Sequence, residues 1–209
     1  PRVISRYGSE RFRPESGKLL AAAYLFQQGT PFLYQGQELG MTNWRPEDPA
    51  AYTDVQTRWQ YEHAALHRSP ARRLHRLWRS SRDSARTPVQ WTAGPNAGFT
   101  DGTPWMPVNE NYREVNAAAQ ENDPDSLLNF YRRAIALRKA LPEVRHGTYR
   151  EFCKGSSRLY LYAREYQGQR LLVVCAFSDV PTVFRAPRGF DLSRAELLLG
   201  NYPPSGSLI

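Results

Sequence analysis

A helix followed at once by a short buried strand constrains the fold of this chain more than any other feature. Residues 15–28 are apolar, rich in alanine and of helical length, and Gly29 ends the segment. Residues 31–34 then form an apolar run without alternation, which is typical of a strand buried on both faces. A strand that follows a helix after so short a link predicts an α/β fold with parallel strands.

A polar turn, residues 35–38, comes directly after this predicted strand. It contains two glutamines and one glutamate. Polar groups at the end of a buried strand are costly unless they have partners or a task there. The turn is therefore a candidate functional element.

The rest of the chain divides into a part with helical periodicity and a part with strand-like alternation. We expect loops at 1–14 and 36–52, and helices at about 53–67, at about 70–80, and from Asp123 (N-cap) and Pro124 (first residue) to Pro142. We expect antiparallel strands at 148–152, 158–164, 170–177, 182–186 and 195–204. The change of pattern predicts two domains, 1–142 and 143–209.

Residues 83–122 form a long stretch with little periodicity. Loops of this length are usually either functional or disordered. This one contains two tryptophans and a phenylalanine, methionine and tyrosine, which disordered linkers avoid. We therefore predict a packed, functional loop.

The composition limits the class of protein. The chain is 41% hydrophobic, which indicates a globular protein, and no apolar run approaches the roughly 20 residues of a membrane helix. The net charge of +8 fits a nucleic-acid partner or a solvated face. Cys153 and Cys175 lack metal-ligand spacing and suggest free thiols in a reducing compartment, so we expect a cytoplasmic protein.

Several site types leave no trace in the sequence. It contains no glycine-rich phosphate loop and no metal-ligand cluster, so we predict neither a metal nor a cofactor. The chain begins at Pro1 without an initiating methionine, and we expect it to be a piece of a longer protein.

Three loops combine polar and aromatic side chains, namely 1–14, 35–52 and 83–122. In parallel α/β barrels, binding groups lie on loops at the carboxyl ends of strands. Aromatic rings can cover the apolar faces of a sugar, while amides and arginine bind its hydroxyls. Composition therefore allows a sugar site, with plain loop packing as the alternative.

Specific motifs support the sugar hypothesis. "RTPVQW" followed by "NAGFTDGTPWMPVNENYREVN" resembles the α-amylase superfamily, glycoside hydrolase family 13, in its oligo-1,6-glucosidase and α-glucosidase branch. "GTPFLYQGQELGMTN" resembles the family's eighth-strand segment, and "PRVISRYG" the continuation of its seventh-strand motif. "LLNFYRRAIALRKALPEVRHGTY" resembles the last barrel helix, and "LLVVCAFSDVPTVF" the C-terminal β-domain. The resemblance covers nearly the whole chain and is weakest at 53–82.

The resemblance implies a fold and site residues. The fold would be the C-terminal part of a (β/α)8 TIM barrel followed by a small antiparallel all-β domain. Arg86 matches the family arginine that holds the non-reducing glucose in subsite −1, paired with an upstream Asp. Arg2 would line or brace the site. Glu38 matches a residue of the family, and its role would be either to brace the loop or to contact the ligand. The family often has glutamate where this chain has Gln37.

No residue of this chain matches the family's catalytic carboxylates, so we predict no catalytic residue within 1–209. Strands seven and eight alone cannot close a barrel. We therefore expect residues 1–141 of this chain to expose the apolar faces of Leu19–Phe26 and Pro31–Tyr34.

The resemblance favours a retaining α-glucosidase that acts as a monomer on small oligosaccharides such as isomaltose or maltose. A trehalose-6-phosphate hydrolase and a sucrose or trehalose isomerase remain alternatives from the same family. A non-catalytic relative that serves as an interaction scaffold is a further alternative. Nucleic-acid binding by residues 68–86, with seven arginines, is the remaining hypothesis, but no reading motif surrounds them, and we predict no nucleic-acid or membrane partner.

Overall fold

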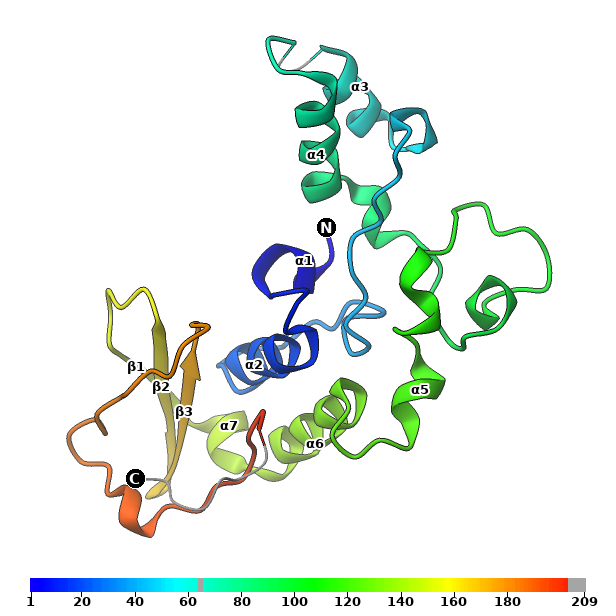
Figure 1. Cartoon of the computed structure of the whole chain (residues 1–209). Coiled ribbons are helices and arrows are strands. Elements are labelled where there is room, and N and C mark those ends of the chain that lie inside the picture. The colour runs from blue at the N-terminus through cyan, green and yellow to red at the C-terminus, as the bar shows by residue number, and fades with distance from the viewer. Residues whose placement is uncertain (64–65, 203–209) are drawn as a thin grey trace. The chain divides into compact units, whose positions relative to one another are not determined.

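A computed structural model describes residues 1–63 and 66–202 of the chain (Figure 1). Its helices are α1 Val3–Tyr7, α2 Arg13–Leu25, α3 Val55–His63, α4 Pro70–Ser80, α5 Ala117–Glu121, α6 Leu127–Ala140 and α7 Pro142–His146. Its strands are β1 Thr148–Phe152, β2 Leu159–Tyr166 and β3 Gln169–Ala176. Short 3-10 turns lie at Pro49–Ala51, Arg82–Ala85, Pro95–Gly98, Glu110–Arg113 and Leu192–Arg194.

The described residues form two compact units. The first contains 1–17 and 33–129, and the second contains 18–32 and the described part of 130–209. The predicted domain boundary at 142 and 143 remains a prediction.

The first unit has two apolar cores. One core contains Leu39, Met41, Val89 and Val115. The other contains Trp44, Tyr52, Leu77 and Met106. Both draw residues from the stretch 83–122, because Val89, Met106 and Val115 are almost completely buried. The prediction that this long loop is packed is therefore confirmed for these residues, whereas the aromatic side chains of Trp91, Phe99 and Trp105 are 51%, 47% and 71% exposed.

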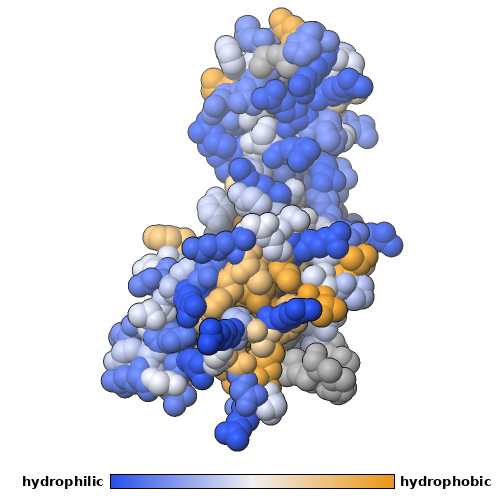
Figure 2. Space-filling model, turned by 90° about the vertical axis from the view of Figure 1, so that its left-hand side faces the viewer, coloured by the Kyte–Doolittle hydropathy of each residue, from blue (hydrophilic) through white to orange (hydrophobic). Residues whose placement is uncertain are grey.

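The helical hairpin of α3 and α4 also belongs to the first unit. The guanidinium of Arg73 donates to the carbonyl of Tyr61 at 2.7 Å and lies 4.6 Å from the ring centre of the same tyrosine. Leu77 is the buried residue of α4, while most of the other α4 side chains are exposed. The part of Figure 2 that contains α3 and α4 is accordingly mostly hydrophilic. Both predicted helices are confirmed, although positions 64–65 lie outside the described residues.

The second unit is built around an antiparallel sheet in the order β1-β2-β3. The central strand β2 is buried from Leu161 to Arg164, with each side chain at most 1% exposed. The hydroxyl of Tyr162 donates to the carbonyl of Ala23 at 3.0 Å, and Arg164 Nη1 donates to the carbonyl of Phe26 at 3.0 Å. These bonds tie the end of α2 to the sheet.

Three strand predictions are wrong. Residues 31–34, 182–186 and 195–202 are irregular, and positions 203–204 lie outside the described residues. Phe32 is 87% exposed, so the expected burial of the 31–34 segment is wrong for the structure described. A strand forms only where a neighbouring strand accepts its backbone hydrogen bonds, and the described sheet contains β1, β2 and β3 alone.

The expected exposure of apolar side chains is confirmed for Phe32–Tyr34 and wrong for the end of α2. Leu25 and Phe26 are at most 5% exposed, because this end of α2 lies within the second unit. Figure 2 shows apolar side chains reaching the surface of one face of the molecule.

Two helix starts also differ from prediction. The segment 1–14, predicted as a loop, contains α1 and the beginning of α2. Helix α6 begins at Leu127 instead of Pro124, because the Ser126 hydroxyl accepts the amide of Asn129 at 3.2 Å. The carboxylate of Asp123 instead accepts the amide of Asp125 at 2.9 Å, which makes a turn before the helix.

Candidate functional site

Arg86 stands at the end of the 3-10 turn Arg82–Ala85, beside two buried carboxylates. Its Nη1 atom lies 3.3 Å from Asp83 Oδ1 and 3.4 Å from Asp54 Oδ1. The Asp83 and Asp54 side chains are 0% and 4% exposed, whereas the Arg86 side chain is 39% exposed. The guanidinium is therefore held on one side and open to solvent on the other.

Local sequence explains the position of Asp54, and bonds from a distant segment explain that of Asp83. Asp54 precedes α3 and accepts the amide of Thr57 at 3.0 Å and its hydroxyl at 2.8 Å, as an N-cap does. Asp83 Oδ2 accepts the amides of Thr53 and Asp54 at 2.8 and 2.9 Å. Sequence reasoning missed both residues, although the predicted helix start at 53 was a signal for a capping Asp54.

The pKa of Asp54 reflects two opposing effects. Burial alone raises the pKa of this carboxyl, but hydrogen bonds from Thr57 and Arg82 stabilise its charge and lower the pKa below 3.8. Arg82 Nη2 lies 2.7 Å from Asp54 Oδ1. The carboxylate is therefore ionised at neutral pH and can hold two guanidinium groups.

Arg2 is buried, at 3% exposure, in the same region of the chain. Its Nε donates to the carbonyl of Ser84 at 2.8 Å, its Nη1 to that of Gln35, and its Nη2 to the carbonyl and hydroxyl of Thr87 at 3.3 and 3.2 Å. Desolvation lowers the pKa of Arg2 to about 10. These bonds join Arg2 to the segments on both sides of Arg86. That Arg2 lines or braces a sugar site remains a prediction.

The polar turn after residue 34 joins this region. Tyr34 donates its hydroxyl to the carbonyl of Ala85 at 3.1 Å. Glu38 is half-buried, and its negative charge partly opposes the lowering of the Arg2 pKa. Gly36 has φ +80°, and an added Cβ would lie 2.2 Å from Met41 Sδ, so this turn requires glycine. The three predicted site residues thus lie along connected segments.

Buried amides connect the neighbouring loops. Asn43 donates to the carbonyl of Trp78 at 2.8 Å and accepts the amide of Arg2 at 2.6 Å. Asn109 donates to the carbonyl of Thr42 at 3.0 Å. Gln90 is completely buried and donates through Nε2 to the carbonyl of Val115 at 2.5 Å. These bonds hold the polar loops against one another.

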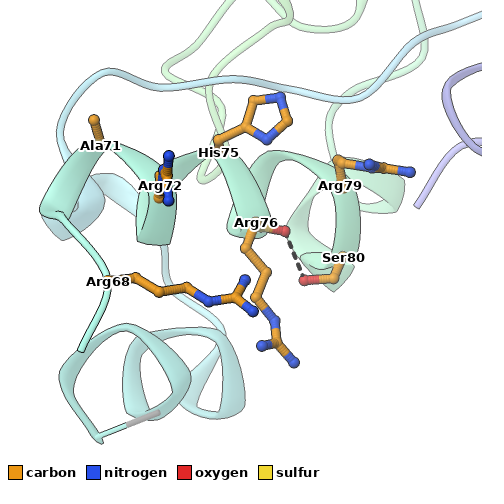
Figure 3. Close-up of a pocket in the computed structure, with 7 residues that line it drawn as sticks. All are labelled: Arg68, Ala71, Arg72, His75, Arg76, Arg79 and Ser80. Atoms are coloured by element: carbon orange, nitrogen blue, oxygen red, sulfur yellow. Dashed lines mark hydrogen bonds between the residues drawn. The ribbon is translucent and has the colours of Figure 1, made fainter. Parts of the chain in front are cut away.

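A shallow pocket of about 530 Å³ lies along α4 (Figure 3). Its lining consists of Arg68, Ala71, Arg72, His75, Arg76, Arg79 and Ser80. The figure shows these side chains spread along one side of the helix. This pocket does not include any of the predicted site residues.

Two further observations concern other kinds of site. Within residues 1–63 and 66–202, no group of three potential metal ligands is brought together. None of the helices described is long and apolar enough to cross a membrane. The predictions of no metal, no cofactor and no membrane partner remain predictions.

Comparison with known proteins identifies the class. A model of the alpha-amylase catalytic domain matches residues 1–147, so the chain belongs to the alpha-amylase family. The fold class is therefore the TIM barrel of that family, although residues 1–63 and 66–202 include none of its parallel strands, and the strands described form the small antiparallel sheet β1–β3. The family resemblance seen in the sequence motifs is confirmed.

Relatives within this family include enzymes of several activities. The chain is 42% identical over 208 residues to a probable oligo-1,6-glucosidase 2 of Bacillus subtilis (strain 168), covering 97% of this chain and 36% of that protein. A trehalose-6-phosphate hydrolase structure from Bacillus licheniformis superposes with a TM-score of 0.90 at 40% identity, over 98% of this chain and 38% of that one. The trehalulose synthase of Pseudomonas mesoacidophila MX-45 gives a TM-score of 0.85 at 39% identity, over 90% and 35%. The chain spans little more than a third of the length of these relatives.

Proposed function

We propose that this chain is the C-terminal part of a retaining α-glucosidase that removes terminal α-linked glucose from short oligosaccharides such as isomaltose or maltose. The observation that carries the proposal is the 42% identity to a probable oligo-1,6-glucosidase across 97% of the chain. The open side of Arg86 adds a chemical reason, because a fixed guanidinium suits sugar hydroxyls.

In the proposed protein, residues 1–142 contribute the last part of the (β/α)8 barrel and residues 143–209 the C-terminal β-domain. Pro31–Tyr34 would be the eighth barrel strand. Pairing with neighbouring barrel strands would satisfy its backbone groups and would bury Phe32, which is 87% exposed. Glu38 would then stand at the carboxyl end of that strand, where barrel enzymes bind their substrates.

The chemistry of retaining glycosidases decides which roles this chain and the rest of the protein would have. Such enzymes need a nucleophilic carboxylate and an acid about 5–5.5 Å apart. We assign neither role to a residue of this chain, so both would come from other parts of the protein. Arg86 would bind hydroxyls of the non-reducing glucose, and Arg2 and Glu38 would line or brace the site around it.

The test is an assay of the full-length protein and its Arg86→Ala variant on isomaltose and maltose, with the anomeric configuration of the released glucose followed by NMR. We expect release of α-glucose, and a loss of kcat/KM of about 10- to 150-fold in the variant, since a hydrogen bond to a charged group is worth about 1.5–3 kcal/mol. Release of β-glucose or no hydrolysis would refute the retaining glucosidase. An unchanged kcat/KM in the variant would remove Arg86 from the site.

The same panel separates the alternatives. Similarity to a trehalose-6-phosphate hydrolase and to a trehalulose synthase favours adding trehalose 6-phosphate and sucrose as substrates. Isomerisation of sucrose without net hydrolysis would favour the isomerase. Inactivity on every substrate of the panel would favour the non-catalytic scaffold.

The proposed protein is a cytoplasmic monomer without cofactor, metal or nucleic-acid partner. The free thiols of Cys153 and Cys175 support a reducing compartment. The arginines along α4 are then a solvated face. Duplex DNA that binds weakly and dissociates at modest salt would fit that reading, whereas salt-resistant binding would contradict it.

A further inference from the structure

We infer that Asp54 and Asp83 are positioning residues, which hold Arg86 by its Nη1 atom and so set the direction in which its guanidinium fork faces the sugar. The inference rests on the proposed function and extends it to residues that the family resemblance did not assign. It also links the segment 53–82, where the resemblance is weakest, to the site.

Backbone groups hold the Asp83 carboxylate independently of Arg86. Its Oδ2 atom accepts two backbone amides, those of Thr53 at 2.8 Å and Asp54 at 2.9 Å. Its side chain is completely buried. The carboxylate therefore has one orientation, in which Oδ1 faces Arg86 Nη1 at 3.3 Å.

Asp54 divides its two oxygens between the helix and the arginines. Oδ2 caps α3 through the amide and hydroxyl of Thr57. Oδ1 accepts Arg82 Nε at 3.0 Å and Arg86 Nη1 at 3.4 Å. The cap fixes the carboxylate on the helix end, so the position of α3 helps to set the position of Arg86.

The bonds to Arg86 are confined to one nitrogen. Nη1 carries two hydrogens, and two carboxylate oxygens face it. Within the part of the chain that the structure describes, Nε and Nη2 donate to no protein group, and the side chain is 39% exposed. The parallel N–H bonds of Nε and Nη2 form a fork that can bind sugar hydroxyls together with the upstream carboxylate that the resemblance implies.

The charge balance supports a positioning role. Two carboxylates, Asp54 and Asp83, face two guanidiniums, Arg82 and Arg86, so the cluster is neutral. An unpaired arginine in a partly buried site would sample many rotamers and would lose that freedom when the sugar binds. The two carboxylates restrict Arg86 in advance.

The experiment uses the full-length protein with Asp54→Asn and Asp83→Asn, each alone and combined with Arg86→Ala. Asparagine caps a helix about as well as aspartate, so Asp54→Asn should keep α3 while removing the charge. The matched control is Asp125→Asn at an exposed position. We expect each substitution at 54 and 83 to lower kcat/KM about tenfold in the wild-type background and less than twofold in the Arg86→Ala background, with the control unchanged.

The same variants give a binding readout. The Kd for glucose, measured by calorimetry, should rise about tenfold in Asp54→Asn and should not rise further when Arg86→Ala is already present. A merely structural loss would add to the effect of Arg86→Ala. Such non-additivity therefore distinguishes positioning from stability.

The outcomes separate the two proposals. If Arg86→Ala itself leaves kcat/KM unchanged, the proposed role of Arg86 and this inference both fail. If Arg86→Ala is strongly impaired while the asparagine variants are silent or additive, only the inference fails. If Asp83→Asn does not fold, Asp54→Asn alone decides.

Discussion

Replacing Arg2 by lysine should harm the protein more than replacing it by methionine, although lysine keeps the charge. Arg2 is 3% exposed and uses three nitrogens to reach the carbonyls of Ser84, Gln35 and Thr87. These acceptors surround a planar fork. A single ammonium nitrogen cannot reach all three, so Arg2→Lys keeps a buried charge but loses part of its hydrogen bonding.

The magnitudes follow from the burial of Arg2. Its pKa falls from 12.5 to about 10, which corresponds to a cost on the order of 3 kcal/mol for keeping the charge in this site. Losing the hydrogen bonds to three carbonyls costs about 1.5 kcal/mol each. Methionine loses these bonds but also removes the cost of the charge, so the net loss should be about 1–2 kcal/mol. Lysine keeps the cost of the buried charge, as arginine does, and loses about two of the hydrogen bonds. The loss of stability relative to wild type should then be about 3–4 kcal/mol.

Hydrogen exchange on the full-length protein measures this difference locally. Amides in residues 35–43 and 84–90 should lose more protection in Arg2→Lys than in Arg2→Met, because these segments carry the carbonyls that Arg2 binds. Thermal melting should give the same order. Protection in Arg2→Lys equal to wild type, or greater than in Arg2→Met, would refute the reasoning that charge burial dominates here.

Three further predictions concern other positions. Gly36→Ala should lower the free energy of unfolding by about 2–4 kcal/mol in chemical denaturation, because φ is +80° and the new Cβ would meet the buried Met41; a change under about 0.5 kcal/mol would contradict this. Burial raises the pKa of Cys175 to about 12, so a thiol reagent at neutral pH should label the exposed Cys153 alone until the protein is denatured; equal labelling of both would show that the burial is wrong. The pKa of Asp54 is lowered in the folded protein, so its ionised form stabilises the fold above about pH 4, and this stabilisation is lost as the pH falls through the pKa of the folded state. Asp54→Asn should therefore have a lower free energy of unfolding than wild type at pH 6 and the same one near pH 2. An equal difference in free energy of unfolding at both pH values would contradict this.

Local sequence was sufficient for the elements that need few distant contacts. Helices α3 and α4 and the strands β1, β2 and β3 appear close to their predicted bounds. A periodic apolar pattern, a cap and a tight turn act over a few residues, so they can be read from the chain. The start of α6 was misplaced because two capping candidates, Asp123 and Ser126, compete, and only the folded backbone shows which one bonds to the first turn.

Local sequence pattern was not sufficient to decide whether residues 31–34 and the segments after 180 form strands. An apolar, β-branched segment becomes a strand only when another strand lies beside it, and the described sheet offers such neighbours to β1, β2 and β3 alone. Phe32, read as buried, is mostly exposed for the same reason. Burial of such a segment depends on pairing partners that are distant in sequence.

The amino-acid sequence by itself determined the family and pointed to Arg86, because the family and this assignment can be recognised from short contiguous motifs. It did not show what holds Arg86. Asp54 lies 32 positions away and reaches Arg86 Nη1 at 3.4 Å, and Arg2 lies 85 positions from Thr87, to which it donates. Only the tertiary structure decided these contacts, since a charged side chain finds its partners through space after the loops have packed, and neither spacing nor composition encodes that distance.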